Sequence, residues 1–327
     1  MGQLHKIALC GKLTADAKKM FYDECADRYE IVEILNETQI PLIRDAEYIV
    51  TRGVPFMERQ IEELGDQTKL IHRWGVGYDS VDINTAAKRG IAVAICAGGN
   101  SQPVAEMTIL LMLASSRKLT ALIERAKEGT KDKEDIIAQS YLLQGKKVGL
   151  IGLGNIGSKV ARMAQGFGAI VQYYDAFRTT PENEAKLGVT YTGLEELLQT
   201  SDIVSVHVPL METTKHLLGA KEFAMMKDGA LLVNTARGGI VDTDALLAAL
   251  ETGKLRGAAL DTIEGEPLPK GHPIFSNEKV LLTPHGAGNT CDNNRNMYEI
   301  IRKNIDAMEN GEMPESRYIV NWRELQY

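Results

Sequence analysis

The chain has 327 residues, more than one hydrophobic core usually supports, so we expect two domains. Hydrophobic residues make up 44% and charged residues 25%, which is the balance of a globular protein and excludes a disordered or fibrous one. The net charge is -7 and the basic residues are scattered along the chain, so the composition argues against a nucleic-acid-binding surface.

Four cysteines, Cys10, Cys25, Cys96 and Cys291, lie far apart and form no CxxC pair. This distribution predicts reduced thiols in the cytoplasm, with neither a disulfide framework nor a metal site. The N-terminal segment 1–12 predicts a short strand and lacks the features of a signal peptide. The apolar run 109–114 is far shorter than the roughly 20 residues of a membrane span, so we expect no membrane partner.

Between residues 5 and 100, short runs rich in β-branched residues alternate with helical patterns. The runs are 7–9, 31–35, 48–51, 70–72 and 91–95. Such alternation predicts a parallel sheet with helices on both faces. The fourth run leads into the turn 75–79, whose backbone N–H groups are candidates to face a ligand; the alternative is an ordinary turn between strand and helix.

Pro103 opens a long apolar helix that we expect to run to about Glu128 and to cross from one domain to the other. A second alternating series extends from Lys147 to about residue 284. An amphipathic helix near 296–310 then returns the chain to the first domain. The predicted domains are therefore 1–103 with 296–327, and 104–295.

A glycine-rich loop follows the first strand of the second series. The strand 147–151 runs into Gly152, Gly154 and Gly157 of a GxGxxG pattern, and a helical pattern follows to Gln165. In this setting the glycines permit a tight turn, a close approach of pyrophosphate and close helix–strand packing, while the helix N-terminus attracts phosphate. The next strand ends in Asp175, near the spacing expected for an acid that binds ribose, so the sequence predicts a dinucleotide site.

Asp175 also bears on which dinucleotide is bound. Its carboxylate would accept hydrogen bonds from the adenosine ribose and repel the additional phosphate of NADP, which favours NAD. Arg178 lies close by and weakens this argument, unless it is a solvated loop residue.

Ligands of open parallel sheets bind beyond the carboxyl ends of the strands. The strand 203–208 ends at Pro209, and the next three strands are followed by Arg237, by Asp261 and by His285. An arginine, an acid and a histidine thus follow three successive strands, and we expect them at one edge of the sheet.

Each of these residues has a structural alternative: His285 as a cap or core residue, Arg237 as the partner of Asp242, and Glu266 as a solvated turn residue. Their joint placement favours an active site for 2-oxo acid reduction. Arg237 would bind the substrate carboxylate through two hydrogen bonds, and His285 would supply the proton for the carbonyl oxygen. Glu266 or Glu264 would keep the imidazole charged and oriented. Asp261 is better placed for the nicotinamide ribose or amide.

With these residues assembled, the chain resembles the D-isomer-specific 2-hydroxyacid dehydrogenase family over nearly its whole length, including its phosphoglycerate and D-lactate dehydrogenases. The motifs are the glycine loop 152–157, the arginine motif 234–242, the glutamate motif 259–267 and the histidine motif 282–285. The resemblance implies an α/β protein with two doubly wound parallel-sheet domains: a Rossmann NAD-binding domain, 104–295, inserted in a flavodoxin-like substrate-binding domain. It also implies homodimers joined through the cofactor domain.

The resemblance assigns catalysis to Arg237, Glu266 and His285, and it favours Glu266 over Glu264. Substrate contacts are implied for Val76, Gly77 and Arg237. The predicted NAD site comprises Gly152, Gly154, Asn155, Ile156, Gly157, Asp175, His207, Val208, Pro209, Thr214, Thr235, Ala236, Arg237, Asp261, His285 and Thr108.

Two departures and three alternatives remain at this stage. Tyr141 stands in a region where family members carry a tryptophan, and Trp74 replaces a small residue, which predicts a reshaped substrate pocket. One alternative is an NAD-sensing regulator resembling the corepressors of this family. Formate dehydrogenases carry glutamine at the position of Glu266, which counts against them. A phosphoglycerate dehydrogenase would need further cations, for which Arg52 and Arg73 are candidates.

Overall fold

The computed structural model describes residues 4–325, so the first three residues of the predicted N-terminal strand lie outside the described part. The chain divides into two compact units: unit one holds the residues up to Asn100 and those from Asn289 onward, and unit two is Ser101–Gly288. These boundaries lie a few residues before the predicted ones. The first differs because helix α4 (Ser101–Ser116) begins ahead of Pro103.

Unit one contains a five-stranded parallel sheet in the order β2-β1-β3-β4-β5, which is the flavodoxin-like order. Successive strand residues point to opposite faces, so Leu9 and Val50 belong to one apolar cluster and Ala8 and Ile49 to another. The strands are β1 (His5–Gly11), β2 (Tyr29–Ile34), β3 (Tyr48–Arg52), β4 (Leu70–Arg73) and β5 (Ala92–Ala94); the helices are α1 (Ala15–Cys25), η1 (Glu37–Ile43), α2 (Glu58–Glu62), α3 (Ile83–Lys88) and α12 (Asn294–Glu309).

Trp74 belongs to the core of unit one. Its side chain is only 7% exposed and packs in the cluster that contains Phe21, with the two ring centroids 6.4 Å apart. The expectation that this ring reshapes the substrate pocket stays a prediction. A large aromatic ring gains more by leaving water for an apolar core than by lining a polar site.

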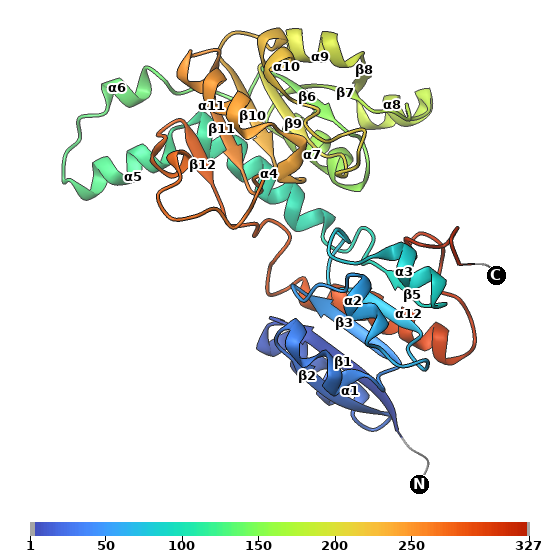
Figure 1. Ribbon diagram of the computed structural model, residues 1–327. Helices are drawn as coiled ribbons and strands as arrows, with labels where there is room; N and C mark the ends of the chain where they lie inside the picture. Colours follow the sequence, from blue (N-terminus) through green and yellow to red (C-terminus); the bar gives the residue numbers. More distant parts are fainter. Residues whose placement is uncertain (1–3, 326–327) are drawn as a thin grey trace. The chain divides into compact units, whose positions relative to one another are not determined.

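Unit two contains a seven-stranded parallel sheet in the order β12-β11-β10-β9-β6-β7-β8 (Figure 1). The chain winds outward from β6 in one direction and from β9 in the other, so the switch point lies between these two strands. The strands are β6 (Lys147–Ile151), β7 (Ile170–Tyr174), β8 (Thr190–Tyr191), β9 (Ile203–Val206), β10 (Ala230–Asn234), β11 (Leu255–Leu260) and β12 (Val280–Leu282). Two parallel sheets confirm the predicted fold class.

Helices cover this second sheet: α7 (Asn155–Gly166), α8 (Pro181–Leu187), α9 (Leu194–Thr200), α10 (Ala220–Met225) and α11 (Thr243–Glu251). The predicted single helix from Pro103 to Glu128 is two helices, because Lys118 adopts a left-handed backbone conformation (φ 51°) after α4. α5 (Leu119–Lys127), which buries none of its residues, and the short α6 (Glu134–Ile137) follow. Within residues 4–325 no helix is both long and apolar enough to cross a membrane.

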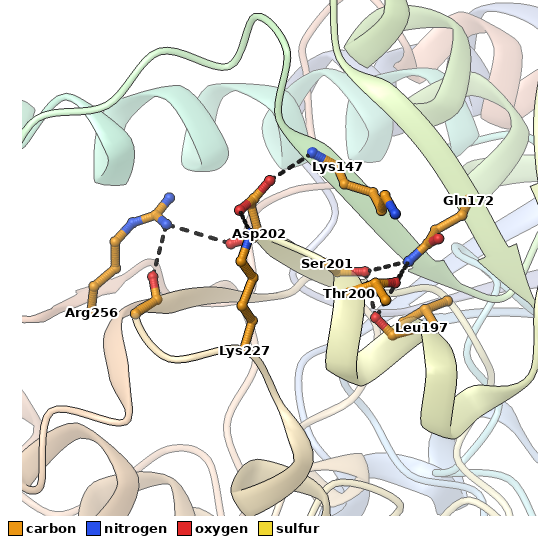
Figure 2. A network of polar contacts seen from close by, with 9 residues as sticks. Lys147, Gln172, Leu197, Thr200, Ser201, Asp202, Lys227 and Arg256 are labelled. Atoms are coloured by element: carbon orange, nitrogen blue, oxygen red, sulfur yellow. Dashed lines mark hydrogen bonds and ion pairs between the residues drawn. The ribbon is translucent and has the colours of Figure 1, made fainter.

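A polar network joins the starts of several strands at the amino-terminal edge of the second sheet (Figure 2). The carboxylate of Asp202 accepts hydrogen bonds from the backbone N–H of Lys147 (2.9 Å) and from Nζ of Lys227 (2.6 Å). The side-chain amide of Gln172 in β7 donates to Oγ of Ser201 (2.9 Å). β6, β7 and the start of β9 are thereby held in register at the edge opposite to the strand ends that carry the predicted site.

We expect Asp202→Asn to lower the free energy of unfolding by about 1 kcal/mol at pH 7, since the charge-assisted bond to half-exposed Lys227 is lost while the Lys147 N–H keeps an acceptor. Burial opposes ionisation of Asp202, but the bonds from Lys227 and Lys147 outweigh it and lower its pKa. The stabilisation is therefore present above pH 4 and disappears as the pH falls through the lowered pKa. Urea unfolding at pH 7 and at pH 3 measures both effects.

Asp228→Asn is the matched control, because Asp228 pairs with Lys254 at a carboxylate that is fully exposed. It should leave unfolding unchanged at both pH values. Equal losses in the two variants would mean that the Asp202 network does not stabilise the sheet.

Candidate active site

The three predicted catalytic residues leave the second sheet at the same edge. Asn234, Leu260 and Leu282 are register partners at the ends of β10, β11 and β12. Arg237 and His285 follow their strands by three residues, and Glu266 follows its strand by six. Because the strands are parallel, their carboxyl ends meet, and the three loops begin beside one another.

His285 is hydrogen-bonded to Glu266. Its Nδ1 lies 2.6 Å from Oε1 of Glu266, and the two side chains are 49% and 32% exposed. A bond at Nδ1 fixes the ring orientation and leaves Nε2 available for a reacting group. Glu264, the other candidate in the sequence, pairs instead with Nε2 of His216 at 2.9 Å.

The backbone of His285 has a left-handed conformation (φ 51°), which is strained for any residue except glycine. Its N–H donates to the carbonyl oxygen of Asp261 at 2.8 Å. The carboxylate of Asp261 is buried and accepts from Oγ1 of Thr283 (2.6 Å) and from the N–H groups of Gly286 (2.9 Å) and Ala287 (2.8 Å). Asp261 thus positions the histidine loop, in addition to its predicted role at the cofactor.

Asn234 shapes the arginine loop. Its side-chain amide donates to the carbonyl oxygen of Arg237 (2.9 Å), and its Oδ1 accepts from the N–H of Ala236 (3.0 Å). Nη1 of Arg237 donates to the carbonyl oxygen of Ala236 at 2.7 Å. Asp242, the alternative partner of Arg237, caps α11 by accepting from the N–H of Ala245.

Gly238 brings the arginine loop against the glutamate loop. A Cβ atom at this position would lie 2.0 Å from the carbonyl carbon of Ile263 and 2.3 Å from the nitrogen of Glu264, so only glycine fits. Sequence reasoning missed this residue, although the Gly238-Gly239 pair directly after Arg237 is a visible signal of close backbone approach.

The glycine loop of unit two has the geometry that a pyrophosphate requires. Gly152 has φ 102°, and a Cβ there would lie 2.8 Å from the carbonyl oxygen of His207. A Cβ on Gly157 would lie 2.2 Å from the carbonyl oxygen of Gly152, which explains the close packing of α7 on β6. Beside Gly154, at the start of α7, there is no atom within 4 Å of the added Cβ position, so the space above the loop is open to a ligand. The residues present fit NAD.

Asp175 follows β7 and faces this loop. Its Oδ2 accepts from the N–H of Leu153 (2.8 Å), and its Oδ1 accepts from the N–H of Phe177 (3.0 Å). The carboxylate is therefore fixed next to the glycine loop, as an acid that binds ribose must be.

Several other residues of the predicted cofactor set have structural contacts at the same sheet edge. The hydroxyls of Thr108 and Thr235 are hydrogen-bonded at 2.8 Å and buried. Oγ1 of Thr214 donates to the carbonyl oxygen of Pro209 at 2.7 Å and so closes the turn after β9. Burial lowers the pKa of His207 to about 3, so its imidazole is neutral at physiological pH. Asn155 is exposed, and Ile156, Val208 and Ala236 are half-buried.

Val76 and Gly77 lie in unit one, in the turn that follows β4, and both are half-buried. Nε of Arg73 donates to the carbonyl oxygen of Gly77 at 2.9 Å, so this arginine shapes the turn. Arg52 donates to Oδ1 of Asn289 at 3.0 Å. The two arginines considered as phosphate ligands thus have contacts within unit one.

Comparison with known proteins agrees with this geometry. Residues 109–287 match the model of the D-isomer specific 2-hydroxyacid dehydrogenase, NAD binding domain. A glyoxylate reductase of Korarchaeum cryptofilum is 36% identical over 277 residues, 84% of this chain and 83% of the relative. A D-3-phosphoglycerate dehydrogenase of Methanocaldococcus jannaschii is 34% identical over 95% of this chain and 59% of its own length. The crystal structure of a glyoxylate reductase from Paecilomyes thermophila has a TM-score of 0.85 at 29% identity, covering 98% of this chain and 99% of that one.

The protein is an NAD-binding oxidoreductase with two α/β domains. It belongs to the D-isomer specific 2-hydroxyacid dehydrogenase family, whose members act on CH–OH groups, and it is an NAD-dependent dehydrogenase that interconverts 2-oxo acids and 2-hydroxy acids. The family predicted from the sequence motifs is confirmed.

We expect Gly238→Ala to reduce kcat/KM for 2-oxo acid reduction at least tenfold, because the added methyl group forces the arginine and glutamate loops apart. Gly239→Ala is the matched control: its Cβ would meet only the flexible end of Leu210, at 3.3 Å. Steady-state kinetics of both variants, with thermal unfolding to verify folding, make the comparison. Equal activity of the two would show that the contact between the loops does not position the site.

Proposed function

We propose that this enzyme reduces a small, unphosphorylated 2-oxo acid of the glyoxylate class to the corresponding hydroxy acid. One observation carries the proposal: the hydrogen-bonded His285–Glu266 pair stands on the same sheet edge as Arg237. Glyoxylate reductases among the relatives support this substrate class, since they match more than 80% of their own length.

In the proposed reaction, NADH when bound supplies a hydride to the carbonyl carbon of the acid. Arg237 binds the substrate carboxylate through its guanidinium. Nε2 of His285 gives its proton to the carbonyl oxygen, which becomes the hydroxyl group. Glu266, bonded to Nδ1, keeps the ring oriented and stabilises the charged imidazolium. In the opposite direction, His285 removes the proton from the hydroxyl group.

A panel of 2-oxo acids with NADH tests this function, with Arg237→Ala beside the unaltered enzyme. We expect the panel to favour the smallest acids, and Arg237→Ala to lower kcat/KM at least about a hundredfold because the carboxylate loses its cation. NADH affinity should change less than threefold. Arg59→Ala, which alters an exposed arginine of unit one, is the control.

Three results would contradict the proposal. Unchanged turnover in Arg237→Ala would remove this arginine from the site. A strong preference for phosphorylated acids would make the enzyme a phosphoglycerate dehydrogenase instead. If none of the acids in the panel supports NADH oxidation, the whole substrate class is refuted.

We propose further that the enzyme is a homodimer joined through unit two. α5 and the segment after it present exposed apolar side chains; Leu119 is 42% and Ile123 45% exposed. β12 is the edge strand of the seven-stranded sheet. Exposed apolar faces and open sheet edges are surfaces that a second copy of the chain commonly covers.

Ile123→Asp should shift the enzyme from dimer to monomer. The new carboxylate on the apolar face of α5 would lose its hydration when two copies associate, and this cost disfavours the dimer. Light scattering with size-exclusion chromatography should give twice the chain mass of 36.0 kDa for the parent protein and for Lys131→Asp, a control at an exposed polar position of the same segment. If the parent protein has the mass of a single chain at micromolar concentration, the proposed dimer is refuted.

We also propose that the enzyme acts in the cytoplasm. The thiols of Cys10, Cys25 and Cys96 are free and buried in unit one. Burial raises the pKa of the Cys96 thiol to about 12, so it stays protonated and unreactive. Fractionation of the source cells, followed by detection of the native protein, tests the location; enrichment in an extracellular fraction would contradict it.

A further inference from the structure

Arg178 is held in a fixed position beside the ribose-binding acid. Its Nε and Nη2 donate to the two carboxylate oxygens of Glu184 in α8, at 2.8 and 2.9 Å. Its guanidinium also lies over the ring of Tyr191, 4.8 Å from the centroid. Two parallel N–H···O bonds and an aromatic face are the geometry in which a guanidinium is most strongly restrained.

Glu184 is itself held in place by a hydrogen bond from a residue of a buried strand. Its Oε1 accepts from the hydroxyl of Tyr173 at 2.7 Å, and the Tyr173 hydroxyl accepts from the N–H of Thr179. Tyr173 lies in β7 with a fully buried side chain, two residues before Asp175. The carboxylate of Glu184 is only 12% exposed. The hydrogen bonds from Arg178 and Tyr173 hold the pKa of Glu184 at about 2, so the ion pair persists throughout the physiological pH range.

This arrangement matters because of where Arg178 stands in the sequence and in the fold. It comes three residues after Asp175, whose carboxylate is fixed to the glycine loop by the Leu153 N–H. In dinucleotide-binding folds an arginine near this acid is what accommodates the 2′-phosphate of NADP. Glu184 occupies Nε and one N–H of Nη2, which is one complete two-point face of the guanidinium. A phosphate that approached the remaining N–H groups would stand beside the Glu184 carboxylate and be repelled by it.

We propose that Glu184 is a positioning residue for cofactor selectivity: by binding Arg178 it withholds an arginine near Asp175 that could bind the 2′-phosphate of NADP. Selectivity for NAD then depends on two acids. Asp175 repels the phosphate at the ribose, and Glu184 keeps the cation away from it. The inference rests on the NAD-binding unit alone and holds whichever acid the enzyme reduces.

The test is a binding titration of NADPH and NADH by the full-length enzyme, without substrate, followed by the fluorescence of the reduced nicotinamide. In Glu184→Gln we expect NADPH affinity to rise on the order of tenfold, because Arg178 exchanges a charged partner for a phosphate. NADH affinity should stay within twofold. Glu182→Gln, at an exposed position of the same helix with no ion pair among those described in residues 4–325, should change neither affinity.

The double variant Glu184→Gln with Arg178→Ala separates release of the arginine from simple loss of a negative charge. If the inference is right, the gain in NADPH affinity disappears in the double variant. If the gain persists there, charge removal alone explains it and the inference is overturned. An unchanged NADPH affinity in Glu184→Gln, in protein whose NADH affinity shows that it is folded, overturns it as well.

Arg178→Ala in the otherwise unaltered chain gives a second test that does not require substitution of Glu184. Because the arginine is already withheld, its removal should leave NADPH affinity within twofold. A tenfold loss would mean that Arg178 already binds the phosphate, and would contradict the inference. None of these titrations involves the oxo acid, so failure here is distinguishable from failure of the proposed function.

Discussion

The buried carboxylate of Asp261 is the interaction on which the rest of the site depends. A carboxylate loses its hydration when it is buried, and this cost is offset only when donors replace the water. Here a hydroxyl and two backbone N–H groups, all from residues 283–287, converge on the two oxygens. The same donors define a single path for the loop, and that path includes the left-handed backbone of His285. The conformation of His285, the proposed proton donor, is thus fixed by an acid that directly follows the neighbouring strand β11.

The parallel register extends this constraint to the other loops. Since Asn234, Leu260 and Leu282 are aligned, the loops that follow them begin at one edge, and short loops cannot carry their side chains far from it. Gly238 then lets two of the loops touch through their backbones. Arg237 and Glu266 are therefore brought together by their positions after strand ends and by the glycine contact. His285 is positioned by Asp261. Each of these steps depends on backbone geometry.

Much of this could be predicted from the sequence, for identifiable reasons. Buried parallel strands read as short β-branched runs, and the glycine loop has a fixed spacing, so both sheets and the dinucleotide site were predictable. The choice between Glu264 and Glu266 was not settled by the residues alone, because it depends on how the loop passes Gly238, a contact between segments distant along the chain. The break at Lys118 and the burial of Trp74 depend on tertiary packing in the same way. So does the pairing of Arg178 with Glu184; the sequence offered Arg178 only as a residue near Asp175 or as a solvated loop residue.

The acidic character of the chain raises the question of how it binds anions at all. Its net charge is -7, yet both the dinucleotide and the oxo acid are negative. Charges farther away than about 8 Å are largely screened at physiological ionic strength, so the groups next to the ligand decide. Near the site, Asp261 and Asp175 are occupied by backbone N–H groups, Glu266 by an imidazole and Glu184 by a guanidinium. Each acid thereby orients a donor or a cation, and an acidic protein can recognise an acid because its local carboxylates are already bonded.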